Sequence, residues 1–438
     1  MMRLLAVTLA ACGIAACAGP VTINDDGGWC WFQDERVLVD GGKLIVGSVA
    51  SGWRDPGRKG QIEVATYDLA SGRTSVFVLH RPDAPRLSAW LDDHNSPGLL
   101  MRADGRFLAM YTMHGVENKI YYRISTRPHD ATAWDEERVF VPSERSRVTY
   151  SNPHFLSREK RIYDFYRGFD NSSKPSWAWS DDLGETWNAG KVLIDVPAKF
   201  RHRPYVKYAS NGADTVHIAY TEGHPRNFDN SIYHIFYRAG MLRRSDGTAI
   251  RALDGGLKEP AEGTRVFQGD RDNVAWISDL HLDARGRPVL VFSVQKDGAG
   301  KPPGEGGEDL RYHYARWTGT SWAEHEIAYG GTKLYAGEDD YTGNLCVDPQ
   351  DPSTVYISTN ADPATGKPLP HREIYRGRTS DGGAKWQWAA VTKDSAEDNI
   401  RPVVPISKND RRALLWLQGR MRSYTDYDFR IVGLIEKR

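Results

Sequence analysis

Short runs of apolar and aromatic residues recur along the whole chain, and residues that favour turns separate them. Val, Ile, Leu, Tyr and Phe dominate these runs, while Gly, Asp and Pro fill the gaps, which is the pattern of β-strands joined by tight turns. The clearest runs are residues 43–49, 61–67, 107–112, 119–124, 162–166, 215–220, 288–293, 354–358 and 413–416. The apolar period of an amphipathic helix is missing over most of the chain, so we predict an all-β protein.

The spacing of these runs and two turn motifs predict a β-propeller. Residues 180–187 read Ser-Asp-Asp-Leu-Gly-Glu-Thr-Trp and match the S-x-D-x-G-x-x-W pattern of an Asp-box, and residues 379–386 carry a weaker copy. In such a hairpin turn, the hydroxyl and the carboxylate bind backbone groups, Gly takes a positive φ, and Trp wedges between neighbouring sheets. At roughly 45–60 residues per four-stranded blade, residues 21–438 predict one domain, a seven-bladed β-propeller.

Composition changes this picture only slightly. Lys and Arg together number 57, and Asp and Glu also number 57, so the chain lacks the basic excess of a nucleic-acid-binding protein. We therefore expect no nucleic-acid partner. The Gly- and Pro-rich stretch 296–308 predicts a long surface loop beside a cleft.

The first residues predict export. Residues 1–17 contain a short basic start and a brief apolar run that is too short to span a bilayer. The run ends in Ile-Ala-Ala-Cys17, which resembles a lipoprotein box, so a lipid on Cys17 would be the only membrane contact; a signal peptide cut near Ala18 is the alternative. The expected location is the periplasm, the outer membrane as a lipoprotein, or the medium. Cys30 and Cys346 could form a disulfide there or stay as buried thiols.

A set of imidazole, phenol and guanidinium side chains forms the candidate site. His94 lies in an Asp-Asp-His-Asn segment, and His114, Tyr150, Arg167 and Tyr205 follow in separate short motifs. These groups suit removal of a carbon-bound proton beside a carboxylate. A sugar hydrolase that works with two carboxylates would need a different set.

Several motifs make the chain resemble one family. They are residues 28–34, 150–153, 203–208, 222–225, 231–234 and 337–343. In these stretches the chain resembles the BNR-4 propeller proteins, which include the seven-bladed ulvan lyases of polysaccharide lyase families 24 and 25. The resemblance implies a polysaccharide lyase acting by β-elimination on an anionic, ulvan-like polymer of rhamnose with glucuronate or iduronate. It also implies catalytic roles for His94 and Tyr150 and substrate binding by His114, Arg167 and Tyr205.

The same resemblance raises the question of a structural metal. One branch of the family carries zinc near the segments that match His224 and His234, and we keep a zinc or calcium ion at these two residues as an expectation. The segment between them offers no Cys, which makes the ligand set incomplete. The chemistry itself needs no cofactor, and we expect a monomer.

Two mechanisms and two other functions stay open from the sequence. Either His94 is the base and Tyr150 the acid on opposite faces of the sugar, or Tyr150 does both on one face. A glycoside hydrolase of the rhamnosidase type is one alternative, although the histidine it takes from an early blade has no counterpart before His80. A propeller that binds carbohydrate without catalysis is the other.

Overall fold

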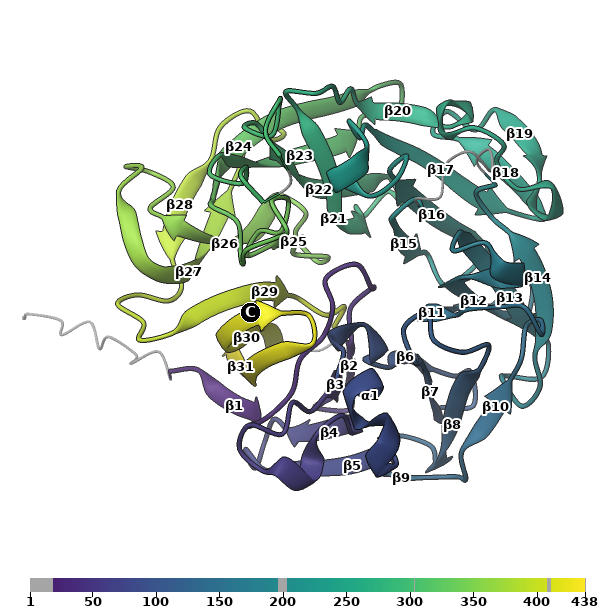
Figure 1. The fold of residues 1–438 in the computed structure, drawn as a ribbon. Coiled ribbons are helices and arrows are strands. Elements are labelled where there is room, and N and C mark those ends of the chain that lie inside the picture. The colour runs from purple at the N-terminus through teal and green to yellow at the C-terminus, as the bar shows by residue number, and fades with distance from the viewer. Residues whose placement is uncertain (1–18, 196–202, 303, 408–410, 438) are drawn as a thin grey trace, which may run out of the picture.

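The computed structural model describes residues 19–195, 203–302, 304–407 and 411–437. The strands of these residues form seven antiparallel sheets arranged around a ring (Figure 1), which confirms the predicted seven-bladed β-propeller. The predicted export segment and its Cys17 lie outside the described residues. Among the helices of the described part, none is long and apolar enough to cross a membrane.

Each blade begins with an innermost strand and adds strands outward. The first three blades are β2 (Val37–Asp40), β3 (Lys43–Val49), β4 (Ile62–Asp68) and β5 (Thr74–His80); β6 (Gly98–Met101), β7 (Phe107–Thr112), β8 (Ile120–Arg127), β9 (Asp130–Trp134) and β10 (Arg138–Phe140); and β11 (Thr149–Leu156), β12 (Arg161–Arg167), β13 (Pro175–Ser180) and β14 (Asn188–Val192). The next three are β15 (Val206–Ser210), β16 (Thr215–Tyr220), β17 (Ile232–Arg238), β18 (Met241–Arg244), β19 (Ala249–Ala252) and β20 (Thr264–Phe267); β21 (Val274–Leu282), β22 (Pro288–Gln295), β23 (Leu310–Trp317) and β24 (Trp322–Gly331); and β25 (Leu345–Val347), β26 (Thr354–Ala361), β27 (Pro368–Arg378) and β28 (Gln387–Ala390).

The last blade joins the two ends of the fold. It consists of β29 (Asp398–Val403), β30 (Arg411–Ser423), β31 (Asp426–Lys437) and the N-terminal strand β1 (Val21–Asn24), which pairs with β31. In Figure 1 the purple β1 lies beside the yellow C-terminal strands. Within the described residues, helical structure is limited to α1 (Leu87–Trp90) and short 3₁₀ turns. These turns are Pro56–Arg58, Ala84–Arg86, Asp93–Asn95, Phe169–Asn171, Pro225–Asn227, Leu253–Gly255 and Pro260–Glu262.

The middle strands of the blades explain why the sequence pattern was readable. Every residue of β7, β16 and β22 is buried, because blades pack against both faces of these strands. Strands covered on both faces read as continuous apolar runs rather than as alternating ones. The hydrophobic clusters lie between neighbouring blades, for example Phe165 of β12 stacked at 4.6 Å on Tyr208 of β15.

Both Asp-boxes form the predicted turns. The hydroxyl of Ser180 donates to Asp182 at 2.7 Å and accepts the backbone N–H of Gly184, whose φ is +90°. Trp187 then lies 6.3 Å from Tyr122 of the preceding blade. The second box repeats these bonds with Thr379, Asp381 and Gly383. These carboxylates hold turns, in agreement with the structural role predicted for them.

The segment between β1 and β2 fills the centre of the ring (Figure 1). Its Trp31 and Phe32 pack on aromatic rings from other blades, with Phe32 at 4.3 Å from Trp276 and 4.5 Å from Tyr205. The ammonium group of Lys207 donates to the backbone oxygen of Gln33. We call residues 29–36 the plug, and its aromatic pair forms the floor of the site described next.

The disulfide considered from the sequence is not formed. Cys30 lies in the plug and Cys346 in β25, and both are buried free thiols. Cys346 packs in the hydrophobic cluster around Trp416. Cys30 belongs to the aromatic cluster at the centre of the ring.

Candidate active site

A tight turn presents His94. Asp92 caps the 3₁₀ turn Asp93–Asn95, and its Oδ1 accepts both the backbone N–H of His94, at 2.9 Å, and the Nδ1 of the same residue, at 2.7 Å. Asn95 accepts the backbone N–H of His114 at 2.7 Å. The Asp-Asp-His-Asn segment therefore fixes its own histidine and the loop that carries the second one.

Asp92 binds both histidines and fixes the positions of their rings. Its Oδ2 accepts from Nδ1 of His114 at 2.8 Å, and the rings of His94 and His114 stack 4.1 Å apart with an angle of 10°. Nη2 of Arg167 lies 3.2 Å from Nε2 of His114. Because a guanidinium can only donate, Nε2 of His114 is the acceptor, and the proton of this imidazole is on Nδ1. His114 is thus a neutral ring fixed between a carboxylate and a guanidinium.

Tyr150 is held in an unusual conformation. It lies in β11 at an irregularity of the ladder and has a φ of +64°, a region that costs a residue with a side chain about 1–3 kcal/mol. The guanidinium carbon of Arg167 lies 4.8 Å from the ring centroid of Tyr150, and the ring of His94 lies 5.7 Å from it. Among the described residues, the hydroxyl of Tyr150 and Nη1 of Arg167 are both buried without a hydrogen-bond partner.

Tyr205 lies beside the centre of the site. Arg167 is 5.8 Å from its ring, but the ring also packs on Phe32 and Trp276 below it. The structure therefore brings together the five residues for which the sequence predicts catalytic or substrate-binding roles. They are His94, His114, Tyr150, Arg167 and Tyr205.

His224 and His234 are not brought together as one ligand set. The ring of His234 lies between His217, at 3.0 Å, and Ser245, at 2.8 Å, whereas Nδ1 of His224 accepts from the backbone of Arg226. In the described part of the chain, the groups of side chains able to hold a metal centre on His94 and on His281, and neither includes these two histidines. The residues present do not fit the zinc site that the resemblance implies.

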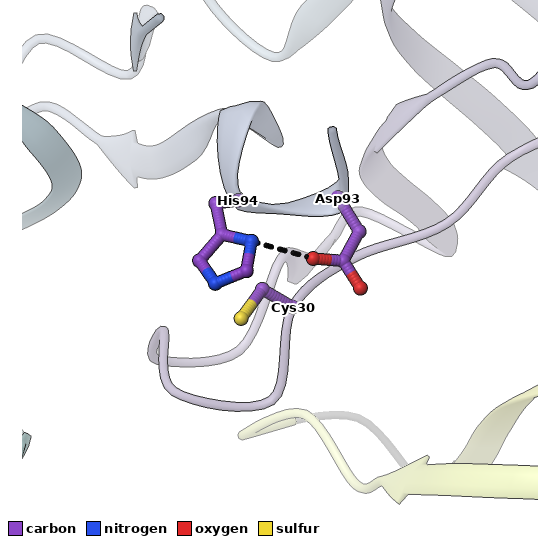
Figure 2. A group of neighbouring side chains, drawn as sticks. All are labelled: Cys30, Asp93 and His94. Carbon is purple, nitrogen blue, oxygen red and sulfur yellow. Dashed lines mark ion pairs between the residues drawn. The ribbon is translucent and has the colours of Figure 1, made fainter. Parts of the chain in front are cut away.

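A buried ion pair that the sequence analysis missed supports the turn from behind. Nη1 of Arg401 lies 2.6 Å from Oδ2 of Asp93, both side chains are 1% exposed, and the same nitrogen donates to the backbone oxygen of Trp29. Oδ1 of Asp93 lies 2.9 Å from Nδ1 of His94, and the Cys30 thiol lies beside this pair (Figure 2). Tyr424 adds an edge contact 5.1 Å from His94. No pattern in the sequence indicated that Arg401 or Tyr424 would lie at this site.

The surroundings set the protonation of the site. Burial lowers the pKa of His94, but Cys30 and Tyr150 in their anionic forms and the carboxylates of Asp92 and Asp93 outweigh it, so the pKa lies well above the ordinary histidine value. Burial and the charge of His94 lower the pKa of His114 to about 4. Burial raises the pKa of Tyr150 above its usual range, although His94 and Arg167 act against the shift. At neutral pH the resting site thus has a protonated His94, a neutral His114 and a neutral Tyr150.

Comparisons with known proteins agree with this fold. Residues 52–329 match the family described as "BNR repeat-containing family member". The chain belongs to this BNR repeat-containing family. The comparison with curated proteins found no match.

Three solved structures similar to this family member are two ulvan lyases and a further polysaccharide lyase. One is a polysaccharide lyase PL25 ulvan lyase bound to -[GlcA(1-4)Rha3S]-, with a TM-score of 0.69, 16% identity, and coverage of 95% of this chain and 98% of that chain. A second structure of a PL25 ulvan lyase has a TM-score of 0.67 at 16% identity, over 95% and 98% of the two chains. The polysaccharide lyase Uly1 has a TM-score of 0.60 at 12% identity, over 92% and 90%. At these identities, the likeness shows a shared fold.

Proposed function

We propose that this BNR repeat protein is a polysaccharide lyase that cleaves a uronate-containing polymer by β-elimination. Ulvan is the first substrate to test, because a similar structure holds its GlcA(1-4)Rha3S unit. Export of the chain, by a signal peptide or as a lipoprotein, is part of this proposal, since such a polymer is met outside the cell.

One observation carries the proposal. Nη1 of Arg167 and the hydroxyl of Tyr150 are buried, lie on neighbouring side chains, and have no hydrogen-bond partner among the described residues. Buried polar groups are nearly always paired, so two unpaired ones at a single place mark the position of a ligand's oxygen atoms. A guanidinium binds a carboxylate through two hydrogen bonds, and a uronate supplies that carboxylate.

The neighbouring carboxylates argue against hydrolysis by an acid pair. Both oxygens of Asp92 accept from histidines, and Asp93 pairs with Arg401 and His94. A glycosidase that works with an acid pair needs one carboxyl group as acid and another as base or nucleophile at the sugar bond. Asp92 and Asp93 instead orient and charge the imidazoles.

The elimination follows from these positions. Arg167 neutralises the carboxylate, which makes the proton on the adjacent C5 easier to remove because charge flows onto that carboxylate in the transition state. A base takes the C5 proton, the C4–O4 bond breaks, a C4=C5 double bond forms, and the leaving O4 receives a proton. The cationic His94 stabilises the phenolate form of Tyr150 when the pair gives up one proton.

The geometry favours the one-face mechanism. A sugar ring placed between His94 and Tyr150 would need van der Waals contact at about 4 Å on each side. The two rings are only 5.7 Å apart and nearly parallel, at 21°. We therefore assign both proton transfers to Tyr150, with His94 as its charged neighbour.

The test is the ultraviolet absorbance of the conjugated uronate product. The purified protein is mixed with ulvan and, separately, with a polymer that lacks uronate. We expect absorbance to rise with ulvan alone. New reducing ends without a rise in absorbance would show that the protein is a hydrolase and not a lyase. Binding of ulvan without either signal would show a propeller that binds carbohydrate without catalysis.

The pH profile provides an independent prediction. The protons of His94 and Tyr150 titrate as a pair, and the pair must lose one before a base is available. Because the pKa of His94 lies above its ordinary value of about 6.5, the active form grows as the pH rises through values above that point. We expect kcat/KM, measured from initial rates, to increase from neutral to alkaline pH. A kcat/KM that is constant or falls between about pH 6.5 and 8, with circular dichroism unchanged, would contradict this assignment.

A further inference from the structure

A thiol, a carboxylate and an imidazole lie close together where the plug contacts the candidate active site. The sulfur of Cys30, a carboxylate oxygen of Asp93 and a ring nitrogen of His94 all lie within 4.8 Å of one another (Figure 2). All three residues are buried, at 2%, 0% and 4% exposure. They come from the plug and from the 3₁₀ turn, two segments of the chain that the fold brings together.

One oxygen of this group lacks a donor of its own. Oδ1 of Asp93 is buried without a hydrogen-bond partner, and its contact with His94 is an ion pair at 2.9 Å. The single Nδ1 proton of His94 is already donated to Asp92, at 2.7 Å. One proton therefore serves two carboxylates, and a cation with more than one bonding direction would satisfy both.

We propose that Cys30, Asp93 and His94 form a binding site for a soft or borderline divalent metal ion such as Zn²⁺ or Cd²⁺. Thiolate, imidazole and carboxylate are the ligands that zinc takes, and the thiolate selects against calcium and magnesium. A tetrahedral zinc ion with bonds of about 2.0–2.3 Å separates its ligand atoms by roughly 3–4 Å. Here Nδ1 of His94 and Oδ1 of Asp93 are 2.9 Å apart, and the three ligand atoms lie within 4.8 Å of one another. The protein supplies these three ligand atoms, and a water molecule would complete the tetrahedron.

Metal binding has a defined proton balance. The ion forms bonds to sulfur, nitrogen and oxygen, and the thiol proton and the Nδ1 proton of His94 leave to the solvent. Binding therefore weakens as the pH falls. The ion occupies the imidazole that stands beside Tyr150, so it inhibits the lyase; this second consequence rests on the proposed function, whereas binding itself does not.

The test uses Cd²⁺ and the ultraviolet charge-transfer band of a cadmium–thiolate bond. Cys12 and Cys17 are replaced by serine in every protein, so that of the four cysteines only Cys30 and Cys346 remain. Cd²⁺ is added until the absorbance no longer changes. Cys346→Ser is the matched control, because Cys346 is the other buried free thiol.

We expect the band in the parent and in Cys346→Ser, and no band in Cys30→Ser. His94→Gln keeps the thiol but removes a metal ligand, so it should weaken Cd²⁺ binding by at least about 100-fold, the upper range for loss of a residue that only supports a ligand. A band that survives Cys30→Ser or disappears in Cys346→Ser, or a parent protein without a band, would overturn the site. Thermal melting of each variant confirms folding, and Cys30→Ala serves if the serine variant does not fold. If the protein cleaves ulvan, Zn²⁺ should lower the rate of cleavage and a chelator should restore it. A cleavage rate that does not change when metal is bound would contradict the inhibitory role but not the metal site.

Discussion

Tyr150→Phe is expected to lower the rate of unsaturated product formation from ulvan by about 10²–10⁴-fold, the range for loss of a general acid or base. The phenyl ring keeps its place between His94 and Arg167, and only the unpaired hydroxyl is lost. The free energy of unfolding should not fall, because that hydroxyl makes no hydrogen bond with the described residues. Absorbance at saturating ulvan and a denaturation curve measure the two effects.

Tyr166→Phe is the matched control for this prediction. Tyr166 lies in the neighbouring strand β12, is 2% exposed, and also has a buried hydroxyl without a partner in the described structure. Its ring packs with Leu108 and Met110 in the cluster between two blades, although the residue also lines the cavity shared by Tyr150 and Arg167. We expect Tyr166→Phe to keep full activity. Equal activity in both variants would show that Tyr150 takes no part in the proton transfers.

Arg401→Met is expected to destabilise the fold by about 3–5 kcal/mol, the cost of leaving one member of a buried ion pair without its partner. The Asp93 carboxylate would remain 1% exposed with no guanidinium 2.6 Å away. The variant also loses the hydrogen bond to the plug at Trp29. Urea denaturation followed by tryptophan fluorescence measures the loss.

Two comparisons isolate the buried charge. The double variant Arg401→Met with Asp93→Asn removes both charges and should recover part of the lost stability. Arg422→Met breaks a partly exposed pair with Asp426 and Asp428 and should cost no more than about 1 kcal/mol. If Arg401→Met costs as little as Arg422→Met, the pair does not support the turn.

The fold could be predicted because its signals are local. Residues 43–49, 107–112 and 215–220 match β3, β7 and β16, since strands buried on both faces are mostly apolar. The Asp-boxes are equally local, because each turn is held by residues within a few positions of one another. The number of blades then follows from how often these strand groups repeat along the chain.

The support of the site could not be predicted, because its contacts join distant parts of the chain. Arg401 lies 308 positions from Asp93, and no local pattern connects them. The Trp-Cys-Trp-Phe run of the plug has no strand or helix period, so its place at the centre of the ring was hidden. The sequence did identify His94, His114, Tyr150 and Arg167 as a group, through short motifs that the ring brings to one face.

Closure of the ring by β1 couples assembly of the site to completion of the chain. β1 pairs with β31, with Val21 opposite Gly433, and residues 25–28 lead from β1 into the plug. A nascent or clipped chain that lacks the last blade has no partner for β1 and no Arg401 to hold Trp29 and Asp93. The Trp31–Phe32 floor is then not anchored, even where the blades carrying His94 and Tyr150 are already formed. The contacts that anchor this floor therefore form only once the last blade is present.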